Sequence, residues 1–124
     1  MDSPRVKRRH ESLQVWKDSM ELVEQVYKVT ARFPNAERFG LCIQMRRASV
    51  SVPSNIAEGA ARDSLKEYIR FLVMARGSLT ELETQIQIAM RLEYIESHDV
   101  CMALTDRVFA KLSALINSLK CKLQ

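Results

Sequence analysis

Histidine and cysteine, the residues most often used as base, nucleophile or metal ligand, are few in this sequence, with 2 and 3 copies. The histidines, His10 and His98, are too far apart to form a pair at metal-binding spacing. The cysteines, Cys42, Cys101 and Cys121, lack the paired spacing of zinc and redox sites and are expected to be reduced packing residues. Cys42 with His98 would be a nucleophile and its base, but a packing cysteine and a surface histidine explain them more simply. We therefore expect no enzyme, no metal and no cofactor.

The stretch SVPSNIAEGAAR, residues 51–62, places a proline and a glycine among polar residues inside an expected helix. At about 100° per residue, its polar residues share one stripe with earlier ones: Gln44, Arg47, Ser51, Asn55, Glu58 and Arg62. Apolar residues border this stripe on both sides, so we expect solvent on the side of Arg46, Ser49 and Pro53. The stripe would then lie buried or half-buried between helices.

The next helix carries a matching polar line that contains Glu67 and Glu81. We name the stripe and these two carboxylates together the polar seam. Arg47 and Arg62 are expected to pair with carboxylates of the seam, because a guanidinium held by a carboxylate can specify the register of two helices. A structural role is favoured over catalysis or ligand binding, since buried polar groups usually satisfy one another, and an ordinary solvated face is the remaining alternative.

Basic residues indicate a different kind of chemistry, the binding of polyanions. The formal net charge is +4, but it is unevenly spread: residues 1–10 and 28–80 are net positive, whereas residues 81–106 are net negative. The candidate nucleic-acid contacts are Arg5, Lys7, Arg8, Arg9, Arg38, Arg46, Lys66, Arg70 and Arg76. Such contacts would form a basic belt for RNA.

Aromatic residues decide what kind of RNA binding is expected. They lie on helical stripes that indicate the core, as for Trp16, Tyr27, Phe71 and Phe109. RNA binding would then be directed at the backbone, sensitive to salt and of low sequence specificity. The alternative is a protein-interaction scaffold that docks a partner protein, without nucleic acid, through its charges.

The composition indicates one ordered, all-α domain. Of the 124 residues 47% are hydrophobic, and only 3 are Gly and 3 are Pro, which favours long helices with short connections. No uncharged stretch approaches the ~20 apolar residues of a membrane-spanning helix, and the basic start leads into no apolar signal core. We expect a cytoplasmic protein without membrane contact.

Apolar periodicity predicts four amphipathic helices. The first spans residues 12–32, with a row of Trp16, Met20, Val23 and Tyr27 that is widened by Val15, Leu22, Val26 and Val29. The second spans residues 35–61 and is kinked near Pro53. The third starts with a capping box of Ser64 and Glu67, and the fourth is expected to be capped by Ser97. A basic, disordered arm (residues 1–11) would precede an antiparallel up-down four-helix bundle (residues 12–124).

The third helix carries two long apolar rows. In the third, two heptad rows run over four repeats: Leu65, Leu72, Leu79 and Ile86, and Tyr68, Ala75, Leu82 and Ala89. Apolar residues outside these rows, such as Ile69 and Val73, exceed the need of one core and indicate self-association. Gly77 in mid-helix would cost about 1 kcal/mol unless helices approach closely there, so ARGSL is a candidate tight crossing.

Two stretches, FPNAERFGLCIQMRRASVSVPSNIAEGAAR and FLVMARGSLTELETQI, also carry a family resemblance. Between Trp16 and about Ile95 the chain resembles the bacterial four-helix bundle proteins encoded in intervening sequences of large-subunit ribosomal RNA genes. It also resembles the accessory protein of diversity-generating retroelements, a pentamer that engages a reverse transcriptase and RNA. Phe39 stands where the pattern more often has tyrosine. The resemblance implies a bundle that assembles into a ring, commonly a homopentamer, with an RNA-related role and no reaction.

Overall fold

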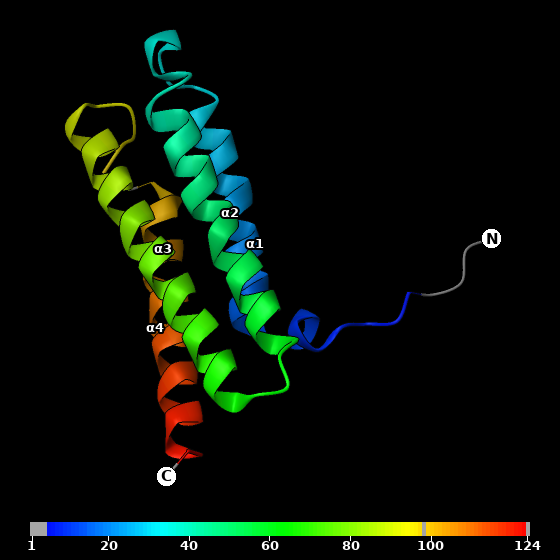
Figure 1. The fold of residues 1–124 in the computed structure, drawn as a ribbon. Coiled ribbons are helices and arrows are strands. Elements are labelled where there is room, and N and C mark those ends of the chain that lie inside the picture. The colour runs from blue at the N-terminus through cyan, green and yellow to red at the C-terminus, as the bar shows by residue number, and fades with distance from the viewer. Residues whose placement is uncertain (1–4, 98, 124) are drawn as a thin grey trace.

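Four long helices form the molecule, whose computed structural model describes residues 5–97 and 99–123. The helices are α1 (Gln14–Thr30), α2 (Leu41–Ala60), α3 (Leu65–Arg91) and α4 (Val100–Cys121), with short 3₁₀ helices η1 (Arg9–Ser12) and η2 (Asn35–Glu37). Successive long helices run in opposite directions, so the α1–α2 and α3–α4 connections share one end of the bundle (Figure 1). The predicted all-α four-helix bundle is confirmed. None of the described helices combines the length and the apolar character needed to cross a membrane.

The core lies between helices that pack as neighbours around the bundle. α2 contacts α1 and α3, and α4 contacts the same two helices. Both predicted heptad rows of α3 face this core: Leu72, Leu79, Ile86, Tyr68, Ala75, Leu82 and Ala89 are buried, and Leu65 is partly buried against them. A row that repeats over four heptads therefore predicted the inner face of α3 correctly.

On α1 the core face is the second of the two predicted apolar rows. Val15, Leu22, Val26 and Val29 are buried, whereas Met20 is 42% and Tyr27 43% exposed. Two adjacent apolar stripes fit the same helical period, and the period alone does not say which stripe faces inward. Tyr27 was thus wrongly expected in the core, as was Phe109 of α4, which is 38% exposed.

Two helix starts differ from the predicted ones. α2 begins at Leu41, after η2 and Gly40, whose backbone (φ −112°, ψ −109°) is neither helical nor extended, rather than at residue 35. α4 is capped by Asp99, whose carboxylate accepts from the Cys101 N–H at 2.9 Å, so the predicted cap at Ser97 is wrong. Asp99 stands directly before the first helical residue, which is the position an N-cap requires.

The predicted cap of α3 is confirmed in one half only. The hydroxyl oxygen of Ser64 accepts from the Glu67 N–H at 3.2 Å. The Glu67 carboxylate, however, accepts from Arg70 Nε at 2.8 Å instead of reaching back to the Ser64 N–H. An ion pair between the first and second turns of α3 thus replaces the reciprocal bond of a capping box.

The tight approach of α2 and α3 occurs at Gly59, not at Gly77. A Cβ atom added to Gly59 would lie 2.9 Å from Phe71 Cβ and 3.1 Å from the Tyr68 carbonyl oxygen. A Cβ atom added to Gly77 would meet nothing within 4 Å. Gly77 itself therefore makes no close approach, whereas its neighbour Ser78 in ARGSL does contact α2, with its hydroxyl oxygen 2.8 Å from that of Ser51. The glycine that permits close packing lies in the last turn of α2.

Pro53 lies inside α2, which continues through it to Ala60. Pro53 and Ser49 are both buried, and the Ser49 hydroxyl donates to the Arg46 carbonyl at 2.8 Å. The expectation that Arg46, Ser49 and Pro53 face solvent is wrong. The exposed side of α2 instead carries Gln44, Arg47, Val50, Ser54 and Glu58.

A buried carboxylate joins α1 to α4. Asp18, which is 4% exposed, accepts hydrogen bonds from Gln14 Nε2 at 2.9 Å and from Lys111 Nζ. Burial by itself raises the pKa of Asp18, but the bonds from Lys111 and Gln14 outweigh it and lower the pKa below its usual value of 3.8. The pair therefore stabilises the folded state when Asp18 is ionised.

Candidate nucleic-acid interface

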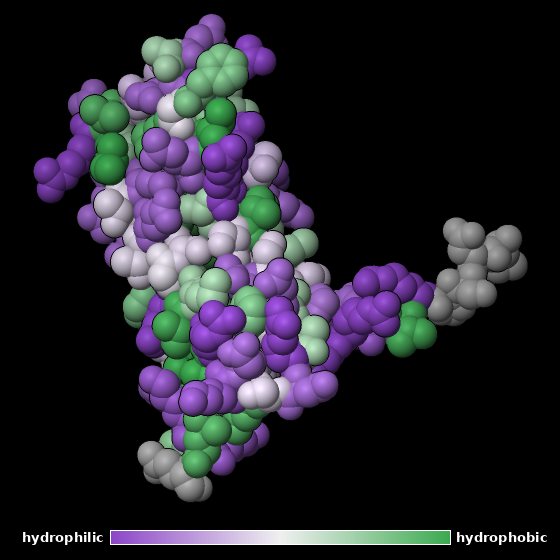
Figure 2. Space-filling model, in the orientation of Figure 1, coloured by the Kyte–Doolittle hydropathy of each residue, from purple (hydrophilic) through white to green (hydrophobic). Residues whose placement is uncertain are grey.

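The uncharged part of the polar seam joins α2 to α3. The hydroxyl oxygens of Ser51 and Ser78 lie 2.8 Å apart, and Asn55 Nδ2 donates to the carbonyl and hydroxyl oxygens of Ser51 at 2.9 and 3.0 Å. Ser51, Asn55 and Ser78 are all half-buried. Figure 2 shows pale, weakly polar residues across the middle of the face where α2 and α3 meet. These bonds provide a polar contact between two helices.

The charged part of the seam faces solvent. Arg47 and Arg62 are exposed, and within residues 5–97 and 99–123 neither forms an ion pair, so the predicted pairing is wrong. α2 ends at Ala60, so Arg62 no longer follows the helical stripe, and its guanidinium carbon lies 4.7 Å from the centre of the Phe71 ring. The other charged or amide members Gln44, Glu58 and Glu81 are also exposed, and Glu67 is half-buried.

A first group of basic residues gathers at the end of the bundle that holds the α2–α3 turn. Arg9 Nη1 donates to the Ala60 carbonyl at 3.4 Å, and its guanidinium carbon lies 5.1 Å from the Tyr68 ring centre. Arg70 lies over the same Phe71 ring as Arg62, at 5.0 Å, and Lys66 is exposed in the first turn of α3. Lys7 and Arg8 are exposed beside η1, on the strongly hydrophilic segment that leaves the bundle in Figure 2.

Two other candidate contacts are already engaged within the chain. Arg5 pairs with Glu11 at 3.1 Å, and Arg76 Nη1 donates to the Ser113 hydroxyl at 3.4 Å. The Arg8 N–H and the Arg5 guanidinium lower the pKa of Glu11 below its usual value. The nine predicted basic residues thus form no single belt. They separate into the α2–α3 end, Arg76 on α3, and a third location.

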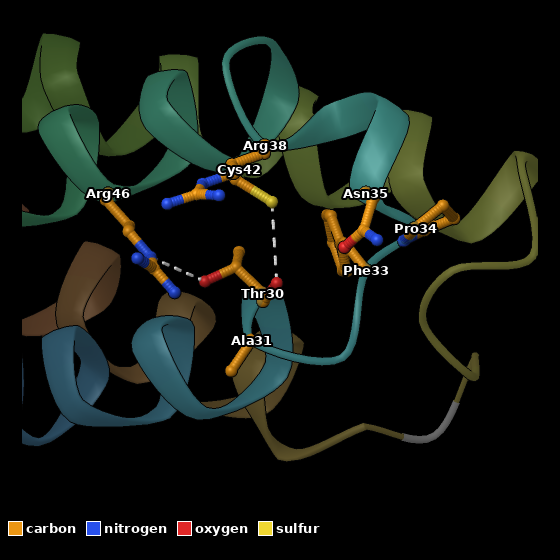
Figure 3. A pocket seen from close by; sticks show the side chains of 8 residues that line it. All are labelled: Thr30, Ala31, Phe33, Pro34, Asn35, Arg38, Cys42 and Arg46. Carbon is orange, nitrogen blue, oxygen red and sulfur yellow. Dashed lines mark hydrogen bonds between the residues drawn. The ribbon is translucent and has the colours of Figure 1, made fainter.

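That third location is a pocket of about 260 Å³ at the opposite end of the bundle. Arg38 and Arg46 line it together with Thr30, Ala31, Phe33, Pro34, Asn35 and Cys42 (Figure 3). Arg46 Nε donates to the Thr30 hydroxyl oxygen at 2.9 Å, and its guanidinium carbon lies 4.6 Å from the Tyr27 ring centre. Thr30 is 2% exposed and its hydroxyl donates to the Val26 carbonyl at 2.6 Å. The structure therefore holds one guanidinium group in place at the mouth of a basic pocket.

Phe39 is a functional candidate that the sequence did not indicate. Its side chain is 81% exposed, and the guanidinium carbon of Arg38 lies 5.4 Å from its ring centre. It lies in the connection between η2 and α2, where no helical periodicity predicts which residues are exposed. The only signal was its position next to Arg38 and Gly40. An exposed aromatic ring can stack on a nucleobase.

Nucleophilic chemistry finds no support in the cysteines. Burial, with smaller contributions from Asp99, raises the pKa of the Cys101 thiol to about 12, so the thiol stays protonated. Cys42 is buried and its Sγ donates to the Thr30 carbonyl at 3.4 Å, whereas Cys121 is exposed. His98, the proposed base, lies outside the described residues. The described part of the chain also contains no group of His, Cys, Asp or Glu side chains arranged to hold a metal ion.

Comparison with known proteins gives one family and one fold. The sequence model of the 23S rRNA-intervening sequence proteins matches residues 11–118. A crystal structure of a protein of unknown function from the S23 ribosomal protein family of Bacteroides thetaiotaomicron superposes with a TM-score of 0.76. It is 22% identical, and the match covers 82% of this chain and 97% of that one, which shows a shared fold. No curated protein sequence matches the chain significantly.

Proposed function

Because the chain belongs to the 23S rRNA-intervening sequence protein family, we propose that it is a non-enzymatic, self-associating bundle that binds RNA. The binding is directed at the phosphate backbone and has low sequence specificity. Arginine and lysine contacts to phosphates release counterions and provide affinity without reading bases. The protein would act in the cytoplasm, where RNA is available.

The observation that carries this proposal is the placement of basic side chains at both ends of the bundle. At one end Arg38 and Arg46 line a pocket whose lining, within the described part of the chain, includes no carboxylate. At the other end Arg9, Arg62 and Arg70 lie around the α2–α3 turn, each against an aromatic ring. Positive charge at two separated places allows an extended polyanion to contact both.

Self-association is supported by the apolar face that α1 and α2 leave uncovered. Met20, Tyr27 and Val50 are 42%, 43% and 41% exposed. Met20 and Val50 line one open groove with Trp16 and Val23. Trp16, Met20 and Val23 belong to the outer apolar row of α1, of which Trp16 also packs against the core. A second copy of the chain is the proposed occupant, in a closed ring for which the family resemblance implies five copies.

A ring would strengthen RNA binding without new kinds of contact. Each copy contributes its own basic residues, and once one subunit has bound, the others act at high effective concentration. Weak contacts at single arginines would therefore add up along one RNA strand. Self-association and RNA binding are thus parts of a single proposal, although each has its own test.

Crosslinking in living cells tests the RNA part directly. RNA recovered with the intact protein is compared with that recovered with a chain lacking residues 1–11 and with an Arg46→Glu, Arg70→Glu variant. An Arg91→Glu, Lys120→Glu variant is the matched control, because it changes net charge equally at exposed positions outside the candidate contacts. We expect the chain lacking residues 1–11 and the Arg46→Glu, Arg70→Glu variant to lose most of the RNA, and the control variant to keep it. RNA at background level for the intact protein would instead favour a scaffold that docks a partner protein.

A further inference from the structure

We propose that the pocket between the end of α1 and the start of α2 is a phosphate-binding site in which Arg38 and Arg46 hold one phosphate group together. The inference rests on the proposed RNA binding for its biological ligand and deepens it by naming the place and the group. A phosphate is the ligand because planar guanidinium forks match its oxygens and can donate two hydrogen bonds each.

Arg46 is positioned in advance for such a ligand. Its Nε atom is occupied by the bond to Thr30 at 2.9 Å, and its planar group lies over the Tyr27 ring at 4.6 Å. Both contacts leave Nη1 and Nη2, which make no hydrogen bond within the described residues. Figure 3 shows this guanidinium group and that of Arg38 both pointing into the pocket that Thr30 and Cys42 also line. A side chain that is already ordered loses less entropy on binding.

Among the described residues, the lining of the pocket includes no acidic side chain that would neutralise these two charges. Glu37 is the nearest carboxylate in sequence, but its Oε1 accepts from the Leu41 N–H at 3.3 Å and its Oε2 from the Tyr94 hydroxyl at 3.0 Å. The last carbonyls of α1 are also occupied, since that of Thr30 accepts from the Phe33 N–H at 3.1 Å and from Cys42 Sγ at 3.4 Å. Two like charges thus share one pocket, and an anion between them would relieve their repulsion.

The size of the pocket suits a phosphate group rather than a whole nucleotide. Its volume of about 260 Å³ is below the roughly 300–1,000 Å³ of pockets that enclose drug-sized ligands. Asn35 on the lining can supply a further amide donor. The remainder of the ligand would lie outside, next to the exposed Phe39 ring. The ligand is therefore a phosphate carried on a larger molecule, either an internal phosphodiester of RNA or a terminal phosphomonoester.

The pocket is tested without RNA by NMR titration of the full-length, ¹⁵N-labelled protein with sodium phosphate, against sodium chloride at equal ionic strength. We expect the Arg46 Nε–H and the Thr30 amide signals to shift saturably with phosphate and not with chloride. Arg38→Gln should weaken phosphate binding about tenfold or more. The Arg38 side chain is exposed and makes no hydrogen bond within the described residues, so this variant keeps the fold. Arg91→Gln, at another exposed site, should bind as the wild type does.

Titration with RNA oligonucleotides of one sequence, with a 5′-phosphate or a 5′-hydroxyl, then separates the two sources of phosphate. Equal affinities assign the pocket to internal phosphodiesters, and tighter binding of the 5′-phosphate form assigns it to the chain end. Phosphate shifts in the pocket without any RNA binding would uphold the site and overturn the proposed function. RNA binding that Arg38→Gln and Arg46→Gln leave unchanged would uphold the function and overturn the site, as would phosphate shifts no larger than those with chloride.

Discussion

Arg46 of α2 donates from its Nε atom to the hydroxyl oxygen of Thr30, the last residue of α1, at 2.9 Å. The bond crosses from one helix to the next at the end of the bundle where the basic pocket lies. Thr30 is buried and Arg46 is half-buried, so this polar contact is partly shielded from water. It links the packing of α1 and α2 to the orientation of a cation that the proposed function needs.

The first prediction concerns Thr30 as a positioning residue. Thr30→Val keeps the shape of the side chain but removes the acceptor for Arg46 and the donor to the Val26 carbonyl. We expect unfolding free energy to fall by about 1 kcal/mol and phosphate affinity to fall roughly two- to tenfold, because one hydrogen bond is lost. Urea unfolding and NMR titration measure the two effects.

The matched control is Thr105→Val. Thr105 is fully buried and donates to the Cys101 carbonyl at 2.7 Å, and it forms no hydrogen bond with an arginine among the described residues. The Thr105→Val variant should lower the unfolding free energy about as much as Thr30→Val does and should leave phosphate affinity unchanged. If both variants reduced phosphate affinity equally, Thr30 would have only a structural role.

The second prediction compares two glycines. Gly59→Ala should lower the unfolding free energy by about 1–3 kcal/mol, because the new methyl group would meet Phe71 Cβ at 2.9 Å. Gly77→Ala should raise it by up to about 1 kcal/mol, since its site is open and alanine favours a helix. Urea denaturation of both variants gives the comparison. A destabilising Gly77→Ala that also disrupts self-association would show that a second copy packs against Gly77.

The third prediction uses pH to test the buried pair of Asp18 and Lys111. Because the pKa of Asp18 is lower in the folded state, its contribution to stability is present above the unfolded-state value of 3.8 and is lost as pH falls through the folded value. Asp18→Asn should cost about 1–2 kcal/mol at pH 7, a moderate loss because Lys111 is 40% exposed and can return to water. The difference from wild type should shrink below about pH 4.

The control for this prediction is Asp106→Asn on the exposed side of α4. It should change stability by less than about 0.5 kcal/mol at either pH. Unfolding in urea at pH 7, 5 and 3 measures all three proteins. A cost of Asp18→Asn that persists undiminished at pH 3 would contradict the assigned role of the ionised carboxylate.

The fourth prediction tests the uncovered apolar face. Met20→Glu places a charge on the outer row of α1, where the side chain is 42% exposed in the single chain. We expect the variant to become monomeric while its helix content stays unchanged, because a charge is costly in an apolar interface. Light scattering gives the mass and circular dichroism the helicity. Ala110→Glu, on an exposed site of α4, should leave the mass of the wild type unchanged.

The last prediction concerns Phe39 beside the pocket. Phe39→Ala should weaken RNA binding by about 1–3 kcal/mol if a nucleobase stacks on the ring, but should leave binding of inorganic phosphate unchanged. The control is Phe109→Ala, which removes an exposed aromatic ring on α4 and should change neither RNA binding nor phosphate binding. Anisotropy titration with labelled RNA measures the difference. Loss of phosphate binding in Phe39→Ala would show instead that the ring supports Arg38.

The fold could be predicted where one apolar pattern was unambiguous. The heptad rows of α3 repeat four times, so Leu72 and Leu79 had only one possible inner face. On α1, the rows containing Leu22 and Met20 were equally apolar, and only the packing of neighbouring helices distinguishes them. The difference between Gly59 and Gly77 likewise depends on a distance between helices, which spacing along one helix does not contain.

The candidate site was less accessible to sequence reasoning. Arg38 and Arg46 were recognised as basic, but their common pocket depends on where α2 begins. The helix was expected from residue 35, which would have continued through Gly40 and changed the position of Arg38 relative to Thr30. The bond between Thr30 and Arg46 crosses that same connection. The number of charged residues can be counted in a sequence, but the connection between α1 and α2 decides that Arg38 and Arg46 line the same pocket.

Binding of single-stranded RNA to the full-length protein across a series of salt concentrations tests the central claim most directly. For the wild type we expect log affinity to fall linearly with log salt, with a slope of about −0.7 for each phosphate contacted, and equally for unrelated sequences. The Arg38→Gln, Arg46→Gln variant should reduce the slope by about 0.7, since both arginines hold one phosphate. Absence of binding at low salt, or an affinity that salt does not change, would contradict the claim.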